Sequence, residues 1–414
     1  MRGRRMKKCE NCGVMIPDKA VFCPECGFKN RAMQVEKTSK KKSKKPWIII
    51  LCLICVAIVV FVAVNVFMKD NNDGKNGVKN EKAVLYKDTI YFIKNRTLYK
   101  ADKDGTKQKE ITQLPHQQMG QDGDGYDNLT IYKDRLYAIR WANYSMTNEY
   151  YIFSVKLDGT DYRKDVRLPW MQGEEGEKYT ADIYGFTIKN DYIYYSYCFQ
   201  DDELNSTSIV YKQKIGTTKR IATKYEAELA PQLSGKYAYY VNGNDDSKTS
   251  QIIRMDVETG KKTSCYSGEN INFAMGGMAI LGDQLIVAKD TDIAIADLKD
   301  SQNSTEKKVA SSSEDGVFIY NANDKEVIYY NDGMIYKMNL QTQKSEELLS
   351  EENIQNNLGI RVRSIEQLGD TLAISGYLDE DEKKEFTIFV EEKEGQDYRS
   401  VISEELKQCQ SGGK

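Results

Sequence analysis

Four cysteines near the amino terminus have the spacing of a metal site. Cys9 and Cys12 form one C-x-x-C pair, Cys23 and Cys26 form a second, and a glycine follows each pair. A C-x-x-C turn directs two thiolates at one ion, and Zn²⁺ takes four such ligands in a tetrahedron. Because thiolates would fill all four positions, the metal would have no open site for catalysis. The sequence therefore predicts one structural Zn²⁺ per chain, bound by these four residues.

Two disulfides or redox pairs are the alternative interpretation of the quartet. A reducing cytosol argues against stable disulfides, and no βαβ pattern surrounds the motif to suggest a thioredoxin-like protein. The quartet resembles the small zinc-ribbon modules at the amino terminus of many bacterial membrane proteins, over about residues 7–30. We expect a zinc ribbon at 1–30, and so short a piece needs its metal to fold.

An apolar run of 22 residues, 47–68, follows a lysine-rich linker at 31–46. As a helix the run would be about 33 Å long, enough to cross a hydrocarbon core of about 30 Å. A cleaved signal peptide is the alternative, but its apolar region would be shorter and nearer the terminus. Basic residues beside a membrane span stay on the cytoplasmic side. We therefore expect a single-pass membrane protein with a transmembrane helix at 47–68, a cytoplasmic amino terminus and an extracytoplasmic carboxy-terminal domain.

The amino-terminal segment and the rest of the chain carry opposite net charges. Residues 1–46 carry a net charge of +10, whereas residues 47–414 carry a net charge of −13. A basic arm could bind nucleic acid, but this one lacks interleaved aromatic residues, and the membrane interpretation already accounts for its lysines. We therefore expect no nucleic acid partner. A cytosolic protein is the partner that the zinc ribbon could contact.

A short pattern recurs seven times after a polar linker at 69–82. Each copy begins with a tight turn, such as Lys87-Asp88 or Lys133-Asp134, followed by an aromatic-rich strand and a second strand. Successive turns are 46, 57, 45, 47, 41 and 46 residues apart. Strands with a period of about 40–50 residues are typical of propeller blades. The sequence therefore predicts a mainly β fold, a seven-bladed β-propeller at 83–405, with six or eight blades as alternatives, and a tail at 406–414.

The sixth copy shows the expected blade most clearly. Its four strands are predicted at 317–322, 326–331, 334–340 and 345–349. The runs Tyr-Tyr-Asn-Asp and Ile-Tyr-Lys-Met-Asn-Leu within this copy resemble the tyrosine-rich propellers of the low-density-lipoprotein-receptor type. They resemble a bacterial domain of unknown function more closely still. This resemblance implies the architecture and assigns no activity.

Blade geometry places two kinds of connection on opposite faces of a propeller. The A–B and C–D turns are uniformly tight, whereas the B–C and D–A connections are elaborated. The long insertions of the second kind lie at 115–129, 140–149, 169–182, 199–207, 243–250 and 378–385. Functional loops usually stand on a rigid scaffold in this way, and aromatic anchors within a polar rim are typical of a protein, peptide or glycan contact. The candidate partner-binding residues are His116, Trp141, Tyr144, Trp170 and Tyr179.

These features favour a membrane-anchored, extracytoplasmic binding or scaffold protein, and we expect no enzymatic activity. His116 is the one histidine, and no nucleophile motif accompanies it. The alternative is a propeller hydrolase acting on cell-wall or surface polymers through paired carboxylates, although the sequence selects no pair. Asp122, Asp124 and Asp127 have a spacing that could bind Ca²⁺, but an Asp/Gly turn is the favoured interpretation.

Overall fold

The computed structural model describes most of the carboxy-terminal part of the chain and two short segments near the amino terminus. The described residues are 6–8, 14–17, 82–115, 124–144, 147–169, 171–172, 178–200, 206–227, 231–242, 249–271, 277–298, 304–309, 317–323, 325–350, 360–378, 381–393 and 398–410. The chain divides into two compact units, Met1–Lys69 and Asp70–Lys414. Each unit is described by itself.

In the first unit a small hairpin flanks the first cysteine pair. Strand β1 (Met6–Lys8) pairs in antiparallel fashion with β2 (Met15–Pro17), and Lys8 lies opposite Met15. Cys9 and Cys12 belong to the connection between these strands and lie outside the described residues, as do Cys23 and Cys26. A hairpin whose two strands flank a C-x-x-C sequence fits the zinc ribbon predicted from the sequence.

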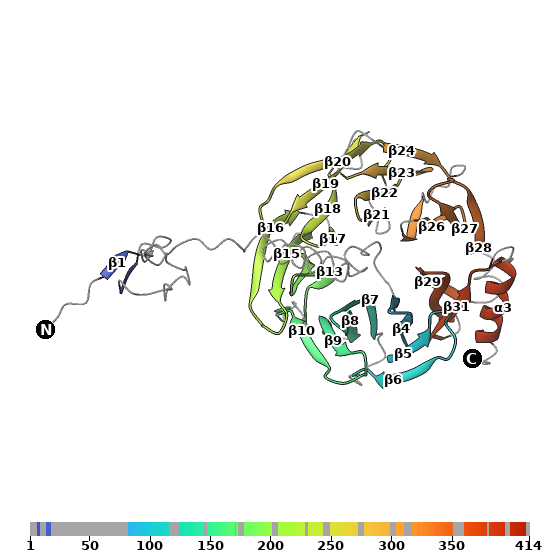
Figure 1. Cartoon of the computed structure of the whole chain (residues 1–414), viewed down its shortest axis with the longest axis horizontal. Coiled ribbons are helices and arrows are strands. Elements are labelled where there is room, and N and C mark those ends of the chain that lie inside the picture. Colours follow the sequence, from blue (N-terminus) through green and yellow to red (C-terminus); the bar gives the residue numbers. More distant parts are fainter. Residues whose placement is uncertain are drawn as a thin grey trace, which may run out of the picture. The chain divides into compact units, whose positions relative to one another are not determined.

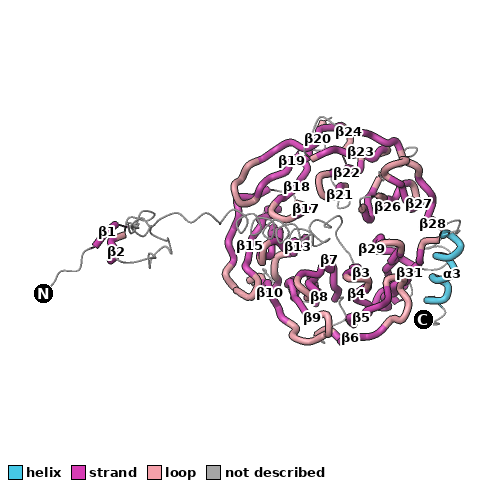
Figure 2. The backbone as a smooth tube through the Cα atoms, viewed as in Figure 1, coloured by secondary structure: helices cyan, strands magenta, loops and turns pink. Residues whose placement is uncertain are grey.

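In the second unit the described residues form seven sheets arranged in a ring, a seven-bladed β-propeller (Figures 1 and 2). Blade 1 contains β3 (Ala83–Tyr86), β4 (Thr89–Lys94), β5 (Thr97–Asp102) and β6 (Lys109–Gln113). Blade 2 contains β7 (Asp124–Tyr132), β8 (Arg135–Tyr144), β9 (Thr147–Lys156) and β10 (Arg163–Arg167), with β11 (Met171–Gln172) and β12 (Lys178–Tyr179) in addition. Blade 3 contains β13 (Asp182–Lys189), β14 (Tyr192–Gln200), β15 (Ser206–Lys214) and β16 (Arg220–Ala227).

The remaining four blades follow in chain order. Blade 4 contains β17 (Gln232–Ser234), β18 (Tyr237–Asn242), β19 (Ser250–Asp256) and β20 (Lys262–Gly268). Blade 5 contains β21 (Met278–Leu281), β22 (Gln284–Ala288), β23 (Asp292–Asp297) and β24 (Ser304–Lys308). Blade 6 contains β25 (Phe318–Ala322), β26 (Glu326–Asn331), β27 (Met334–Asn339) and β28 (Ser345–Ser350). Blade 7 contains β29 (Ile360–Leu368), β30 (Thr371–Leu378) and β31 (Asp381–Glu391), followed by helix α3 (Tyr398–Gln410).

Apolar clusters between neighbouring blades make up the core. Because successive residues of a strand point to opposite faces of its sheet, each blade packs one set of side chains against the preceding blade and the other set against the next. Tyr137 and Ile139 of β8 face blade 3, for example, whereas Leu136 and Ala138 face blade 1. Strands that alternate between two apolar faces explain why these sequences are hydrophobic throughout.

The recurring turns of the sequence are the A–B turns of the blades. Lys87 and Asp88 have φ angles of 49° and 58°, and Lys133 and Asp134 have 49° and 57°. Positive φ at both central residues is the pattern of a type I′ turn, whose twist matches that of the flanking strands. These turns also connect blades, because Lys87 Nζ and Tyr86 Oη each contact Asp134 Oδ1 of the next blade at 2.8 Å.

Blade 7 differs from the other six because its described residues contribute three strands and a helix. Helix α3 packs against β31 and against β28 of blade 6 (Figure 1). Ile402, Leu406 and Cys409 of α3 are buried in the same cluster as Leu348 of β28 and Ile388 of β31. The helix therefore covers the outer side of blade 7, where the other blades carry a fourth strand.

The predicted membrane location is corrected by the structure. Among the residues that the structure describes, no helix is long and apolar enough to cross a membrane. Helix α3 has 13 residues, which give about 20 Å and fall short of a hydrocarbon core of about 30 Å. The apolar run 47–68, on which the prediction of a transmembrane helix was based, lies outside the described residues.

Replacing Leu406 by Ala should destabilise the propeller, because Leu406 is fully buried in the α3 cluster. Truncation of a buried leucine costs about 2–5 kcal/mol of unfolding free energy. Chemical denaturation of the full-length chain measures this loss. Glu404→Ala on the exposed side of the same helix is the matched control and should cost less than about 0.5 kcal/mol. Equal losses for both variants would show that α3 contributes no core packing.

Candidate partner-binding face

The ring closes where blade 7 meets blade 1, and we call this contact the closing seam. Among the described residues each of the two blades is built from consecutive strands, and no strand from one terminus completes the sheet of the other. The apolar cluster at the seam has six buried residues, fewer than the other interblade clusters of the described residues. Phe92 of blade 1 and Phe389 of blade 7 meet edge to face there. Polar contacts add to this apolar packing where the ring closes.

Lys82 makes polar contacts with three blades at once. Its backbone N–H donates to Glu366 Oε1 of blade 7 at 2.8 Å. Its ammonium donates to the Tyr126 carbonyl at 2.6 Å and pairs with Asp127 Oδ1 at 2.8 Å, both in blade 2. Lys82 directly precedes β3 of blade 1 and is 7% exposed. One residue thus connects blades 7, 1 and 2 around the inner strands.

The electrostatic environment keeps Lys82 charged despite its burial. Desolvation lowers the pKa of a buried ammonium. The carboxylates of Asp127 and Glu385 more than compensate, so that the pKa of Lys82 lies above its usual value. A lysine that remains a cation can hold the Asp127 carboxylate over the whole physiological pH range.

Trp141 belongs to the same polar network. Its indole Nε1 donates to Asp127 Oδ2 at 2.6 Å, so Asp127 binds Lys82 with one oxygen and Trp141 with the other. The ring also lies over Gly125, where an added Cβ would come within 2.5 Å of Trp141 Cζ2. Glycine at this position leaves room for the indole. Trp141 is therefore a fixed, half-buried side chain on this side of blade 2.

The insertion after β10 is partly ordered into two short strands. β11 and β12 pair with each other, and β12 continues in parallel pairing with β9, where Tyr179 lies opposite Asn148. The end of β8 lies nearby in the same sheet, because Tyr144 pairs with Thr147. The structure thus brings the backbones of Tyr144 and Tyr179 to one end of blade 2.

Trp141 is the one predicted binding residue whose side chain lies within the described part of the chain. His116 and Trp170 lie outside the described residues, as do the side chains of Tyr144 and Tyr179. Lys82, Asp127 and Glu366 were not predicted as site residues. Their contacts join residues up to 284 positions apart, and a buried lysine at the start of a strand gives no local sequence signal.

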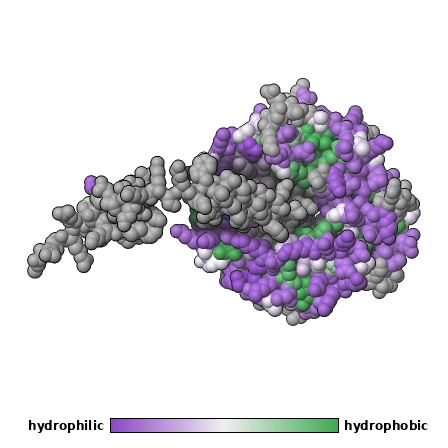
Figure 3. Space-filling model, in the orientation of Figure 1, coloured by the Kyte–Doolittle hydropathy of each residue, from purple (hydrophilic) through white to green (hydrophobic). Residues whose placement is uncertain are grey.

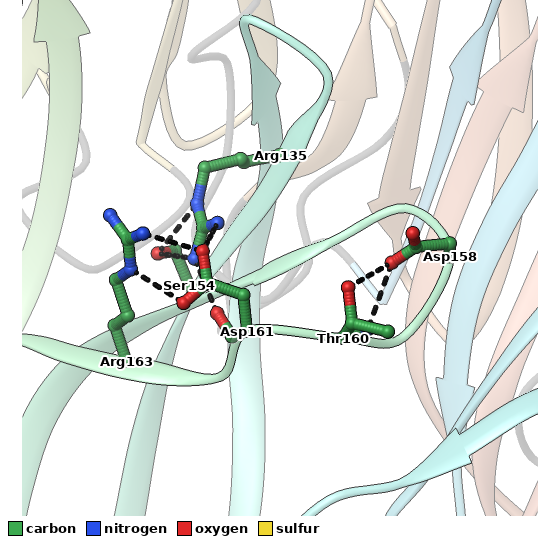
Figure 4. A network of polar contacts seen from close by, with 6 residues as sticks. All are labelled: Arg135, Ser154, Asp158, Thr160, Asp161 and Arg163. Atoms are coloured by element: carbon green, nitrogen blue, oxygen red, sulfur yellow. Dashed lines mark hydrogen bonds and ion pairs between the residues drawn. The ribbon is translucent and has the colours of Figure 1, made fainter.

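The opposite face of blade 2 carries a second polar network, which surrounds the turn between β9 and β10 (Figure 4). Arg135 NH1 donates to Asp161 Oδ2 at 2.9 Å, and Arg135 NH2 donates to Ser154 Oγ at 2.9 Å. Arg163 Nε donates to Asp161 Oδ1 at 2.9 Å. Asp158 Oδ1 accepts from the backbone and hydroxyl of Thr160 and shapes the turn. Both arginines have carboxylate partners, so this network stabilises a tight turn.

A comparison with protein families found a match at the amino terminus of the chain, and a comparison with solved structures found matches over most of its length. A family model described as a zinc-ribbon domain matches residues 8–30. The chain therefore carries a zinc ribbon at its amino terminus, and such domains bind zinc. A comparison with curated proteins found no matching sequence.

The solved structures similar to this chain have distant sequences. An uncharacterized protein of Listeria monocytogenes is 12% identical, with a TM-score of 0.42, over 78% of this chain and 97% of that chain. An oligogalacturonate lyase of Vibrio parahaemolyticus is 9% identical, with a TM-score of 0.45, over 77% and 91%. The β-propeller domain of the Trilobed protease of Pyrococcus furiosus is 11% identical, with a TM-score of 0.39, over 66% and 83%.

The expectation that the chain is not an enzyme is corrected by these comparisons. An oligogalacturonate lyase and a domain of a protease are among the similar structures. At such low identity the likeness shows the fold alone, and it assigns no reaction to this chain.

Replacing Trp141 by Phe should destabilise the chain by about 1.5–3 kcal/mol, because it removes a hydrogen bond to the Asp127 carboxylate. In a chain that already carries Asp127→Asn, Trp141→Phe should cost less unfolding free energy, because the charged acceptor is then absent. Urea denaturation of the two single variants and the double variant gives the coupling energy between the residues. Additive losses would contradict a direct interaction between them.

Proposed function

We propose that the propeller is a binding module whose partner contacts the face formed by the B–C and D–A connections, which we call the long-loop face. The observation that carries the proposal is the difference between the two faces. On the long-loop face the connections between strands contain 19 Asp+Glu and 4 Lys+Arg. On the opposite face they contain 14 Asp+Glu and 11 Lys+Arg. The surplus of negative charge is thus much larger on the long-loop face, a net charge of −15 from 19 acidic and 4 basic residues, than on the opposite face, where 14 acidic and 11 basic residues give −3.

The chemistry of the long-loop face favours a polar, basic partner. A face of one sign attracts an oppositely charged partner and raises the rate of association, more strongly at low salt. Ile221 is the single large hydrophobic side chain exposed among the described residues of the propeller. The visible surface in Figure 3 is mostly hydrophilic, with smaller hydrophobic areas. A protein or peptide segment with clustered Lys or Arg residues fits this surface best.

Trp141 supports the same face as the place of contact. Aromatic residues held in a fixed conformation add contact area at a small entropic cost, and they are enriched among residues that dominate binding energy. Asp127 and Gly125 hold the Trp141 indole in one orientation. We include His116, Tyr144, Trp170 and Tyr179 in the proposed face because their segments join strand ends on this side.

For the amino-terminal unit we propose that Cys9, Cys12, Cys23 and Cys26 bind one Zn²⁺ with a structural role. The hairpin of β1 and β2, which brackets the first pair, supports this assignment. Four thiolates leave the metal no position for a substrate, and metal binding supplies the free energy that folds so small a unit.

The partner proposal is tested with a lysine-rich peptide and the full-length chain. Neutralising Glu174 and Glu175 in the connection between β10 and β13, as Glu174→Gln and Glu175→Gln, should weaken binding by about 2–30-fold, since exposed charges contribute about 0.2–1 kcal/mol each. Fluorescence anisotropy at low and high salt measures the affinity. Asp88→Asn with Asp370→Asn on the opposite face is the matched control and should change little. Equal weakening by both pairs would refute a face-specific site.

The zinc proposal is tested by metal analysis of the purified chain. Replacing Cys9 and Cys12 by Ser should abolish one bound zinc per chain, because two thiolates do not complete a tetrahedral site. Cys198→Ser is the control, since Cys198 lies in β14 of the propeller, and it should leave the zinc content unchanged. A zinc content unaltered by the double substitution would show that the metal binds elsewhere.

A further inference from the structure

Glu366 occupies an unusual position at the closing seam. It lies in β29, an inner strand of blade 7, and is 3% exposed. Its Oε1 accepts the hydrogen bond from the Lys82 backbone, which joins blade 7 to blade 1. Its Oε2 is buried and accepts no hydrogen bond within the described part of the chain. A buried carboxyl group with one unpartnered oxygen is far better accommodated in its neutral form.

The charge of Lys82 favours the ionised form of Glu366, but the ammonium group of Lys82 has its contacts elsewhere. Lys82 faces the carboxyl group, but the Lys82 ammonium donates to the Tyr126 carbonyl and pairs with Asp127, both in blade 2. Strand β29 also packs against β25 and β30. Among the described residues, neither of these strands offers Glu366 a charged partner, and Asn321 of β25 binds the backbone of Gln367 instead. Ser364 on the same strand contributes a hydroxyl group and no charge.

We propose that Glu366 makes the closing seam sensitive to protons, so that the seam is held most tightly when this carboxyl group is protonated and is weakened when it ionises. The proton comes from solvent, and no covalent bond changes. Ionisation places an unpaired negative charge between blades 7 and 1. The strain falls on the seam, whose apolar cluster has the fewest buried residues of the seven interblade clusters formed by the described residues, so this contact has the least apolar packing to resist loosening.

The direction of the pH effect follows from the environment of Glu366. Burial raises its pKa to about 7, although the Lys82 N–H, the Ser364 hydroxyl and the charge of Lys82 oppose this shift. A carboxyl group with a raised pKa binds more protons in the folded chain than in the unfolded chain. Its contribution is fully present below the usual glutamate pKa of about 4.3 and is lost as the pH rises through 7. The seam should therefore be tighter at pH 6 than at pH 8.

A chain of contacts connects Glu366 at the closing seam to Trp141 on the candidate partner-binding face. Lys82 bonds to Glu366 through its backbone and to Asp127 through its side chain, and Asp127 holds Trp141. A change at the seam therefore reaches Trp141 through two residues. The proton sensitivity itself does not depend on the proposed partner, because it is a property of the closed ring.

Hydrogen exchange of the full-length chain tests the proposal locally. After correction for intrinsic rates, peptides covering 82–98 and 381–393 should exchange several-fold faster at pH 8 than at pH 6. A peptide covering 278–297 in blade 5 should show no such change. Glu366→Gln, which mimics the protonated group and keeps the acceptor for the Lys82 N–H, should abolish the pH dependence at the seam and leave it closed at both pH values.

A matched control separates Glu366 from other carboxylates of the seam. Glu385 Oε2 accepts a hydrogen bond from the Asn95 backbone, which also joins blades 7 and 1. Glu385→Gln should loosen the seam equally at pH 6 and pH 8 and retain the pH dependence of the wild type. A pH dependence spread evenly over all blades, or one retained in Glu366→Gln, would overturn the proposal.

Discussion

A β-propeller must bring its first and last blades together, and in this chain the contacts of one lysine join the two blades that meet. Lys82 bonds to blade 7 through its backbone and to blade 2 through its ammonium group, while its own chain continues into blade 1. Unlike hydrogen bonds between strands, these contacts involve ionisable groups. The closure of the ring is therefore linked to the ionisable groups of Lys82, Asp127 and Glu366.

The contacts between the other neighbouring blades resemble one another. Each pair of neighbouring blades shares an apolar cluster, and the type I′ turns of the first blades add an interblade ion pair on one face. Exposed pairs such as Lys87 with Asp134 contribute little free energy singly. Their value lies in fixing the register of adjacent blades. On the long-loop face the connections vary in length and carry most of the surplus negative charge. The two faces therefore differ in structure and in charge.

The repeat period was sufficient to predict the blades because turn and strand signals are local. The strands predicted at 326–331 and 345–349 agree with β26 and β28 to within one residue. Turn residues such as Lys87-Asp88 require positive φ and mark each A–B connection. Helix α3 was missed, because a single short amphipathic segment at the end of a repetitive β sequence resembles a tail.

The polar contacts of the closing seam could not be predicted from the sequence. Glu366 and Lys82 are 284 residues apart, and nothing in their neighbouring residues signals burial. Trp141 could be selected as an aromatic residue in a long connection, but its bond to Asp127 requires the geometry of the irregular β7–β8 pairing. The membrane prediction rested on one apolar run, and the described residues offer no helix that supports it.

Because every blade consists of consecutive residues, the sequence repeat and the structural repeat begin and end at the same points. A duplicated stretch of gene that encodes one repeat would thus add one whole blade, without dividing any sheet between the two chain ends. Such a ring can change its size by whole units during evolution. The side chains at the junction of the outermost blades would then be the ones that must adapt to the new circumference.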